Sequence, residues 1–159
     1  MILLALAAAT LAASPGGRSR PAKVQVDADE VQYQYQDRKA VFHGRPLVKL
    51  TREDAVLTCR RLDTENDEEG GIRRAVCTGD VKLVRGPKTA TCERATFDNA
   101  TGRVVCTGNP VLRDGESVMR GQLLTYDLDA DRVTMSQARG TMVPTEQQER
   151  RTARKKDAP

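Results

Sequence analysis

Apolar and polar residues alternate along most of this chain with a period of two, which is typical of half-buried β-strands. The pattern is clearest over residues 91–112. Ala95 and Phe97 alternate with polar neighbours, a turn-rich segment follows at 98–103, and a second alternating row runs from Val104 to Leu112. This stretch therefore predicts a strand, a tight turn and a second strand.

The same pair of strands recurs along the chain. The first strand has copies at 28–33, 59–64, 92–97 and 121–126, and the second has copies at 40–48, 75–83, 104–112 and, in degenerate form, 133–139. Gly44, Gly79 and Gly108 occupy equivalent places in three of these copies. Two strands in each period of about 30 residues predict an all-β fold in which repeating strand pairs stack and share one core.

Two interruptions of the alternation recur in every complete copy. The apolar phase slips after Ala28, Cys59, Cys92 and Gly121, which predicts a β-bulge or a corner between two sheets. The recurrent glycine of the second strand, followed two residues later by Pro46 or Pro110, predicts a second bend. The strands are therefore expected to turn from one layer into another.

Composition limits the kind of core and the class of partner. The chain has 159 residues, of which 3% are aromatic and none is tryptophan, so one domain with a thin core of Val, Leu, Ala and Cys is expected. The net charge of +4 favours acidic partners, such as anionic lipids or nucleic acids. Single-stranded nucleic acids are usually read by stacking on aromatic side chains. With so few aromatics, we expect no nucleic-acid partner.

The two ends of the chain differ from its middle. Residues 1–13 form an apolar run of signal-peptide length, too short to span a bilayer, and predict export. Residues 14–23 are then expected to form a flexible lead-in, and residues 24–143 the folded domain. Residues 144–159 lack hydrophobic periodicity and predict a disordered basic tail.

The four cysteines occupy two equivalent pairs of positions in the repeat. Cys59 matches Cys92, and Cys77 matches Cys106, on apolar positions that face inward. They are interpreted either as small buried hydrophobes or, after export, as the disulfides Cys59–Cys92 and Cys77–Cys106. Bridging requires Cα atoms within about 7 Å of each other.

Catalytic and metal-binding signatures are missing from the sequence. His43 is the only histidine and no cysteine pair has the CxxC spacing, so no metal site is predicted. There is no nucleophile motif and no phosphate-binding loop. The sequence therefore favours a binding or scaffolding protein without a cofactor over an enzyme.

Short motifs in the repeat resemble the OstA-like family of lipopolysaccharide transport proteins. The matching segments are Ala-Asp-Glu-Val-Gln-Tyr at 28–33, Gly-Asn-Pro-Val-Leu at 108–112 and Thr-Tyr-Asp-Leu at 125–128. The resemblance covers residues 24–143, including the charged insertion at 63–74, and it implies an open, twisted β-jellyroll. The four cysteines and the short signal depart from the family pattern.

The resemblance also implies a function. Such proteins bind lipopolysaccharide in the periplasm and form a bridge that carries it from the inner to the outer membrane for outer-membrane assembly. The implied partners are lipopolysaccharide, LptC-like inner-membrane and LptD-like outer-membrane jellyrolls, and further copies of the chain joined head to tail.

Two sets of residues would carry this function. The inward row of the repeats is expected to contact acyl chains, and its members are Phe42, Val48, Leu83, Val104, Leu112, Leu124 and Met135. Main-chain pairing with neighbouring modules is expected at two outer edges, residues 24–33 and 133–143, with Val24 and Val26 and Val133 and Met135 as the pairing residues.

Two alternatives remain. One is an LptC-like partner of the same fold, which would need an apolar amino-terminal run of about 20 residues. The other is a structural β-repeat protein that binds no lipid.

Overall fold

The computed structural model describes residues 21–144 and is built from strands, which confirms the predicted all-β class. Within these residues there is no helix, and hence none long and apolar enough to cross a membrane. The predicted signal peptide, most of the lead-in and almost all of the basic tail lie outside the described residues. The strands are β1 (Val24–Asp27), β2 (Glu30–Gln34), β3 (Lys39–Arg52), β4 (Ala55–Asn66), β5 (Ile72–Arg85), β6 (Lys88–Asp98), β7 (Arg103–Thr107), β8 (Val111–Asp114), β9 (Ser117–Arg120), β10 (Leu123–Asp127), β11 (Arg132–Ser136) and β12 (Arg139–Thr141).

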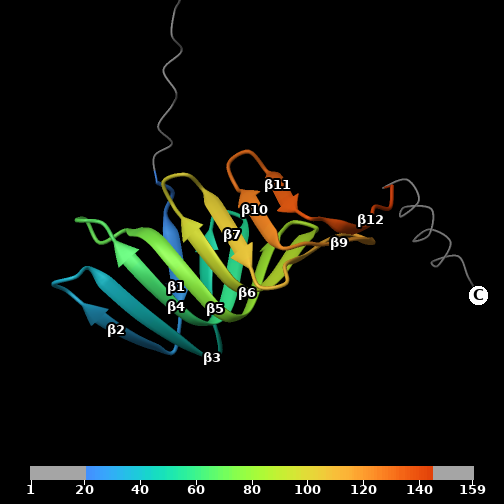
Figure 1. The fold of residues 1–159 in the computed structure, drawn as a ribbon. Helices are drawn as coiled ribbons and strands as arrows, with labels where there is room; N and C mark the ends of the chain where they lie inside the picture. Colours follow the sequence, from blue (N-terminus) through green and yellow to red (C-terminus); the bar gives the residue numbers. More distant parts are fainter. Residues whose placement is uncertain (1–20, 145–159) are drawn as a thin grey trace, which may run out of the picture.

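All twelve strands belong to one antiparallel sheet that is folded into two layers (Figure 1). The long strands β3 to β6 run through both layers and bend in their middle. The β7 layer contains β2, β7, β10, β11 and one half of each long strand, and the β8 layer contains β1, β8, β9, β12 and the other halves. The main path of the sheet begins at β1 and ends at β11, which do not pair with each other, so the sheet is open.

The bends lie where the sequence predicts them. Register shifts interrupt β3–β4 between His43 and Val48, and interrupt β4–β5 and β5–β6 beside Gly79. Gly79 and Gly108 have φ of 81° and 79°, in the left-handed region that glycine adopts without strain. The degenerate last copy keeps this conformation without glycine, since Gln137 has φ 48° at the place equivalent to Gly108. Local backbone chemistry therefore favours the turn from one layer into the other at Gly79 and Gly108.

The core lies between the two layers and is small-chained, as the composition predicts. Buried residues from both layers form one apolar cluster, in which Phe97 and Tyr126 are the fully buried aromatic residues. Leu57 and Leu83 from the β8 layer and Leu62 and Leu124 from the β7 layer are at most 2% exposed. Packing between layers, rather than large rings, therefore holds the fold together.

The cysteine pairing predicted from the repeat is wrong. The structure joins Cys59 to Cys77, with Cα atoms 5.7 Å apart, and leaves Cys92 and Cys106 as thiols. Cys59–Cys92 and Cys77–Cys106 cannot form because equivalent residues of successive copies lie two strands apart in the sheet. At a strand spacing of about 4.8 Å, that separation exceeds the reach of a disulfide.

Candidate functional site

The seven residues of the predicted inward row lie on one continuous surface between the layers. Val48, Leu83, Val104 and Leu124 are at most 2% exposed, whereas Phe42, Leu112 and Met135 are half-buried and pack against the same cluster. The structure thus brings all seven together. Their contact with acyl chains stays a prediction. The four buried members are covered by the opposite layer, so a ligand would reach the half-buried ones first.

A cavity of about 580 Å³ lies beside this interior at the amino-terminal end of the sheet, and its apolar walls pack against the core cluster. It lies between β1 of the β8 layer and the turn that joins β4 to β5 in the β7 layer, and its apolar walls are Val24, Val26, Phe42 and Ile72. Its volume is within the usual range of ligand-binding pockets, about 300–1,000 Å³. Ile72 was not predicted from the sequence, because it lies within the charged insertion at 63–74, where apolar and polar residues do not alternate.

Strand β2 carries apolar side chains that no part of the described chain covers. Val31 is 54% exposed and pairs with Phe42, while Tyr33 is 36% exposed and pairs with Ala40, so both lie on the interior face of the sheet. Tyr35 continues the patch, with its ring 4.6 Å from that of Tyr33. At this end, the apolar interior face of the sheet therefore extends beyond the part that the opposite layer covers. Val31 and Tyr33 lie within the amino-terminal edge, residues 24–33, that the sequence predicts.

The opposite end of the sheet is also unpaired. Among the described residues, β11 pairs only with β10, and β12 pairs only with β9. Val133 and Met135 of β11 direct their side chains to the core cluster, beside Tyr126 and Leu124. Both residues lie on an outer strand, as predicted, and their pairing with another chain stays a prediction.

The direction of the backbone groups along β11 follows from the hydrogen bonds of its neighbours. The N–H of Leu128 donates to the carbonyl oxygen of Gly102 at 2.8 Å, in line with the β10–β7 register. Backbone groups of successive residues alternate in direction along an antiparallel strand. The backbone N–H and C=O groups of Thr125 therefore point to β11, and those of Thr134 point back to β10. The backbone N–H groups of Val133 and Met135 point to the free side of the sheet.

Polar side chains join the two layers at the hairpin turns opposite the bends. Arg52, in the β8 layer, donates from Nε to Asn99 Oδ1 at 3.2 Å and from Nη1 to Asp129 Oδ1 at 2.9 Å, and both acceptors belong to turns of the β7 layer. The amide nitrogen of Asn99 in turn donates to the carbonyl oxygens of Ala22 and Ile72. We call Arg52, Asn99 and Asp129 the turn-side clasp.

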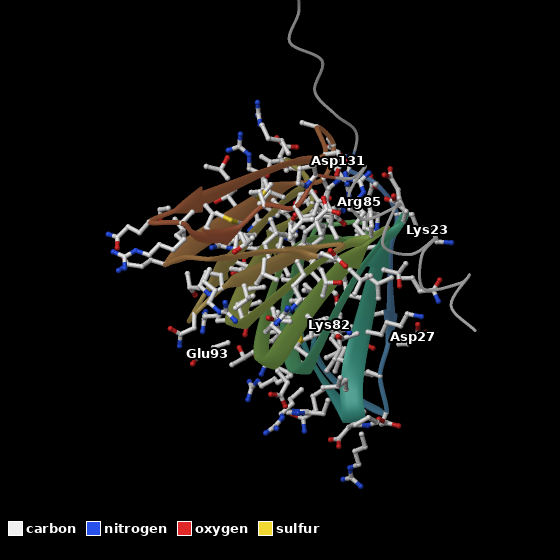
Figure 2. The ribbon with its side chains drawn as sticks, turned by 90° about the vertical axis from the view of Figure 1, so that its right-hand side faces the viewer. Lys23, Asp27, Lys82, Arg85, Glu93 and Asp131 are labelled. Atoms are coloured by element: carbon white, nitrogen blue, oxygen red, sulfur yellow. A yellow bond between two sulfur atoms is a disulfide. The ribbon has the colours of Figure 1, made fainter. Side chains whose placement is uncertain are left out.

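A second cluster of polar side chains lies near the turn-side clasp and is centred on Asp131. Figure 2 shows Arg85 and Asp131 near each other. Lys88 Nζ is 2.8 Å from Asp131 Oδ2, and Tyr126 donates its hydroxyl hydrogen to Asp131. The hydrogen bond from Lys88, followed by that from Tyr126, lowers the pKa of Asp131. Burial, followed by the hydrogen bond to Asp131, raises the pKa of Tyr126 to about 12.

This architecture, an open two-layered sheet with an apolar interior that reaches both ends, agrees with comparisons to known proteins. The family model described as "LptA/(LptD N-terminal domain) LPS transport protein" matches residues 25–132. That match spans more than half of the chain, so the chain belongs to this family of lipopolysaccharide transport proteins. The family expected from the sequence motifs is thereby confirmed.

One solved structure shows the same fold. It is LptH from Pseudomonas aeruginosa, described as the LptA homologous periplasmic component of the lipopolysaccharide transport device. The TM-score is 0.68 at 16% sequence identity, and the match covers 80% of this chain and 100% of LptH. No curated protein sequence matches the chain significantly.

Proposed function

We propose that this chain is a periplasmic module that holds the acyl chains of lipopolysaccharide between its two layers and passes the lipid along a bridge from the inner to the outer membrane. The observation that carries the proposal is the continuity of the apolar interior with both open ends. It is lined at one end by Val24, Val26 and Phe42 and at the other by Leu112 and Met135. A conduit needs such continuity, whereas a purely structural repeat would be capped.

The interior suits alkyl chains in its chemistry. Its wall consists mostly of aliphatic and small side chains, with Phe42, Phe97 and Tyr126 as aromatic members, and no buried side-chain polar atom is left without a partner among the described residues. Transfer of an alkyl chain from water to such a surface contributes about 0.8 kcal/mol for each methylene group. Several methylenes therefore suffice to drive binding once the layers separate or the chain enters from an end.

The ends suit partners with the same fold. The exposed Val31 and Tyr33 lie on the interior face, so a second jellyroll stacked on β2 would cover them and extend the apolar surface. Strand addition supplies main-chain hydrogen bonds at such an edge. The partners proposed here are LptC-like and LptD-like jellyrolls and other copies of this chain, reached after export directed by residues 1–13.

A lipid-binding assay tests the proposal. The chain is purified, incubated with lipopolysaccharide, separated by size exclusion and extracted for mass spectrometry. Phe42→Ser, which makes the amino-terminal cavity polar, should lower the bound lipid several-fold. Val41→Ser is the matched control, because Val41 is the neighbouring half-buried residue on the opposite face of β3. Equal lipid on both variants, or none on the unmodified chain, would contradict the proposal and leave the lipid-free structural protein.

A further inference from the structure

We propose that Cys92 and Cys106 form a second disulfide, equivalent to Cys59–Cys77, through exchange with a disulfide oxidant that approaches Cys92 from the surface. The inference does not depend on lipid binding. It rests on the repeated geometry of the sheet, on the contact between the two thiols and on their unequal access to solvent.

The two cysteine pairs occupy the same places in the sheet. Cys77 of β5 lies opposite Leu62, three residues after Cys59, and Cys106 of β7 lies opposite Ala95, three residues after Cys92. In each pair the first cysteine marks the bend of a long strand. The second cysteine precedes a glycine in the left-handed region by two residues, namely Gly79 and Gly108.

Sulfur contacts repeat as well. Cys59 Sγ lies 3.1 Å from the carbonyl oxygen of Arg61, and Cys92 Sγ lies 3.3 Å from that of Arg94. The thiols of Cys92 and Cys106 lie close enough to perturb each other's pKa. Because Cys59 and Cys77 are bridged at the equivalent places in the sheet, we expect Cys92 and Cys106 to be within reach of a disulfide as well.

Access determines which thiol reacts first. Cys92 is half-buried and lines a surface cavity of about 390 Å³. Lys82 and Glu93, both labelled in Figure 2, line the same cavity. Cys106 is fully buried. The hydrogen bond from Cys106 lowers the pKa of Cys92, while that same bond and burial raise the pKa of Cys106. Cys92 is therefore the attacking thiol and Cys106 the resolving one.

The disulfide forms in two successive thiol–disulfide exchanges. The Cys92 thiolate attacks one sulfur of the oxidant disulfide, forms a mixed disulfide and releases the first oxidant thiolate. Cys106 then attacks Cys92 Sγ, and its proton passes to the second oxidant thiolate as that thiolate leaves. Two protein thiols are oxidised by two electrons, and the oxidant disulfide is reduced to two thiols.

A Cys92–Cys106 disulfide would link β6 to β7, at the place where the two layers continue as separate strands. Strand β6 is the last strand to run through both layers, because beyond it β7 continues one layer and β8 the other. Cys59–Cys77 already ties β4 to β5 at their bends. A bridge from β6 to β7 would fix the neighbouring bend on the way to the carboxy-terminal strands.

A non-reducing peptide map tests the inference. The folded full chain is reduced, treated with glutathione disulfide, blocked with N-ethylmaleimide and digested with trypsin. The tryptic peptides 89–94 and 104–113 should be recovered linked to each other, as peptides 53–60 and 75–82 are through Cys59–Cys77. Recovery of Cys92 and Cys106 as blocked thiols, or linked to any other cysteine, would overturn it.

Two variants test the order of attack. Cys106→Ser should accumulate a glutathione adduct on Cys92, whereas Cys92→Ser should leave Cys106 at least several-fold less modified. Equal modification of both variants would refute the assigned roles. The map of the unmodified chain needs no variant, so it remains decisive even if a substitution disturbs folding.

Discussion

Arg52 and Asp129 are 77 residues apart in the chain, yet Arg52 Nη1 lies 2.9 Å from Asp129 Oδ1 and joins the β8 layer to the β7 layer. The Arg52 side chain is 3% exposed and that of Asp129 is 35% exposed. A buried guanidinium is stable only with acceptors around it, and here Asn99 and Asp129 provide them. The clasp thus closes the interior on the side opposite the bends.

Asp129→Ala should lower the free energy of unfolding by about 2–3 kcal/mol, because it leaves the buried Arg52 with Asn99 alone. The loss should stay below the roughly 3–5 kcal/mol seen for fully buried pairs, since Asp129 is partly solvated. Urea unfolding measures the change. Glu65→Ala, which breaks an exposed pair with Arg73, is the control and should cost about 1 kcal/mol at most. Equal losses of unfolding free energy in the two variants would show that the Arg52–Asp129 pair stabilises the fold no more than an exposed ion pair does.

Tyr126 should make the fold sensitive to alkali. Its pKa is raised to about 12 in the folded state, against about 10 in an unfolded chain. The folded state thus favours the neutral phenol, and this contribution to stability is fully present below pH ~10 and is lost as the pH rises through about 12. Phenolate absorbance should show a late step that Tyr126→Phe removes. If the unmodified chain and Tyr126→Phe lose stability equally over this interval, the assignment is wrong.

The repeat made the local features of this fold predictable from sequence. Alternation located the strands and their inward residues, and the left-handed backbone at Gly79 and Gly108 follows from residue type. The repeat did not predict which residues far apart in the chain are neighbours in the sheet. Aligning the copies placed Cys59 with Cys92, although neighbours in the sheet come from consecutive strands and not from equivalent ones.

The turn-side clasp was hidden for a related reason. Arg52, Asn99 and Asp129 lie at three different hairpin turns, and each sequence there predicts only a turn. Their meeting depends on how the two layers lie over one another after bending. Likewise, side-chain alternation gives the face of β11 but not the direction of its N–H groups, which needs the register with β10 and β7.

A photo-crosslinking amino acid in β8 should report which face meets lipid. Leu112 is half-buried on the interior face, and the adjacent Arg113 is exposed on the other face of the same strand. During incubation with lipopolysaccharide, the crosslinker at position 112 should capture several-fold more lipid than the crosslinker at 113. Comparable capture at both positions would mean that lipid binds outside the predicted interior.

Proline substitution along β11 should separate the stability of the domain from its association with partners. The N–H groups of Val133 and Met135 point to the free side of the sheet, whereas that of Thr134 faces β10. Proline is tolerated on an edge strand where its missing N–H would face solvent. Thr134→Pro should instead leave a β10 acceptor without its donor and cost about 1–3 kcal/mol of unfolding free energy.

Val133→Pro is therefore the sharper test of edge pairing. It should change the unfolding free energy by no more than about 1 kcal/mol relative to Val133→Ala, the control for the lost side chain. It should nevertheless weaken head-to-tail association or partner binding, because strand addition uses the outward N–H that proline removes. Thermal unfolding and sedimentation velocity measure the two properties on the same samples. If Val133→Pro associates as strongly as Val133→Ala, and Tyr33→Pro on the outer side of β2 does so relative to Tyr33→Ala, the chain does not join its neighbours through these edges.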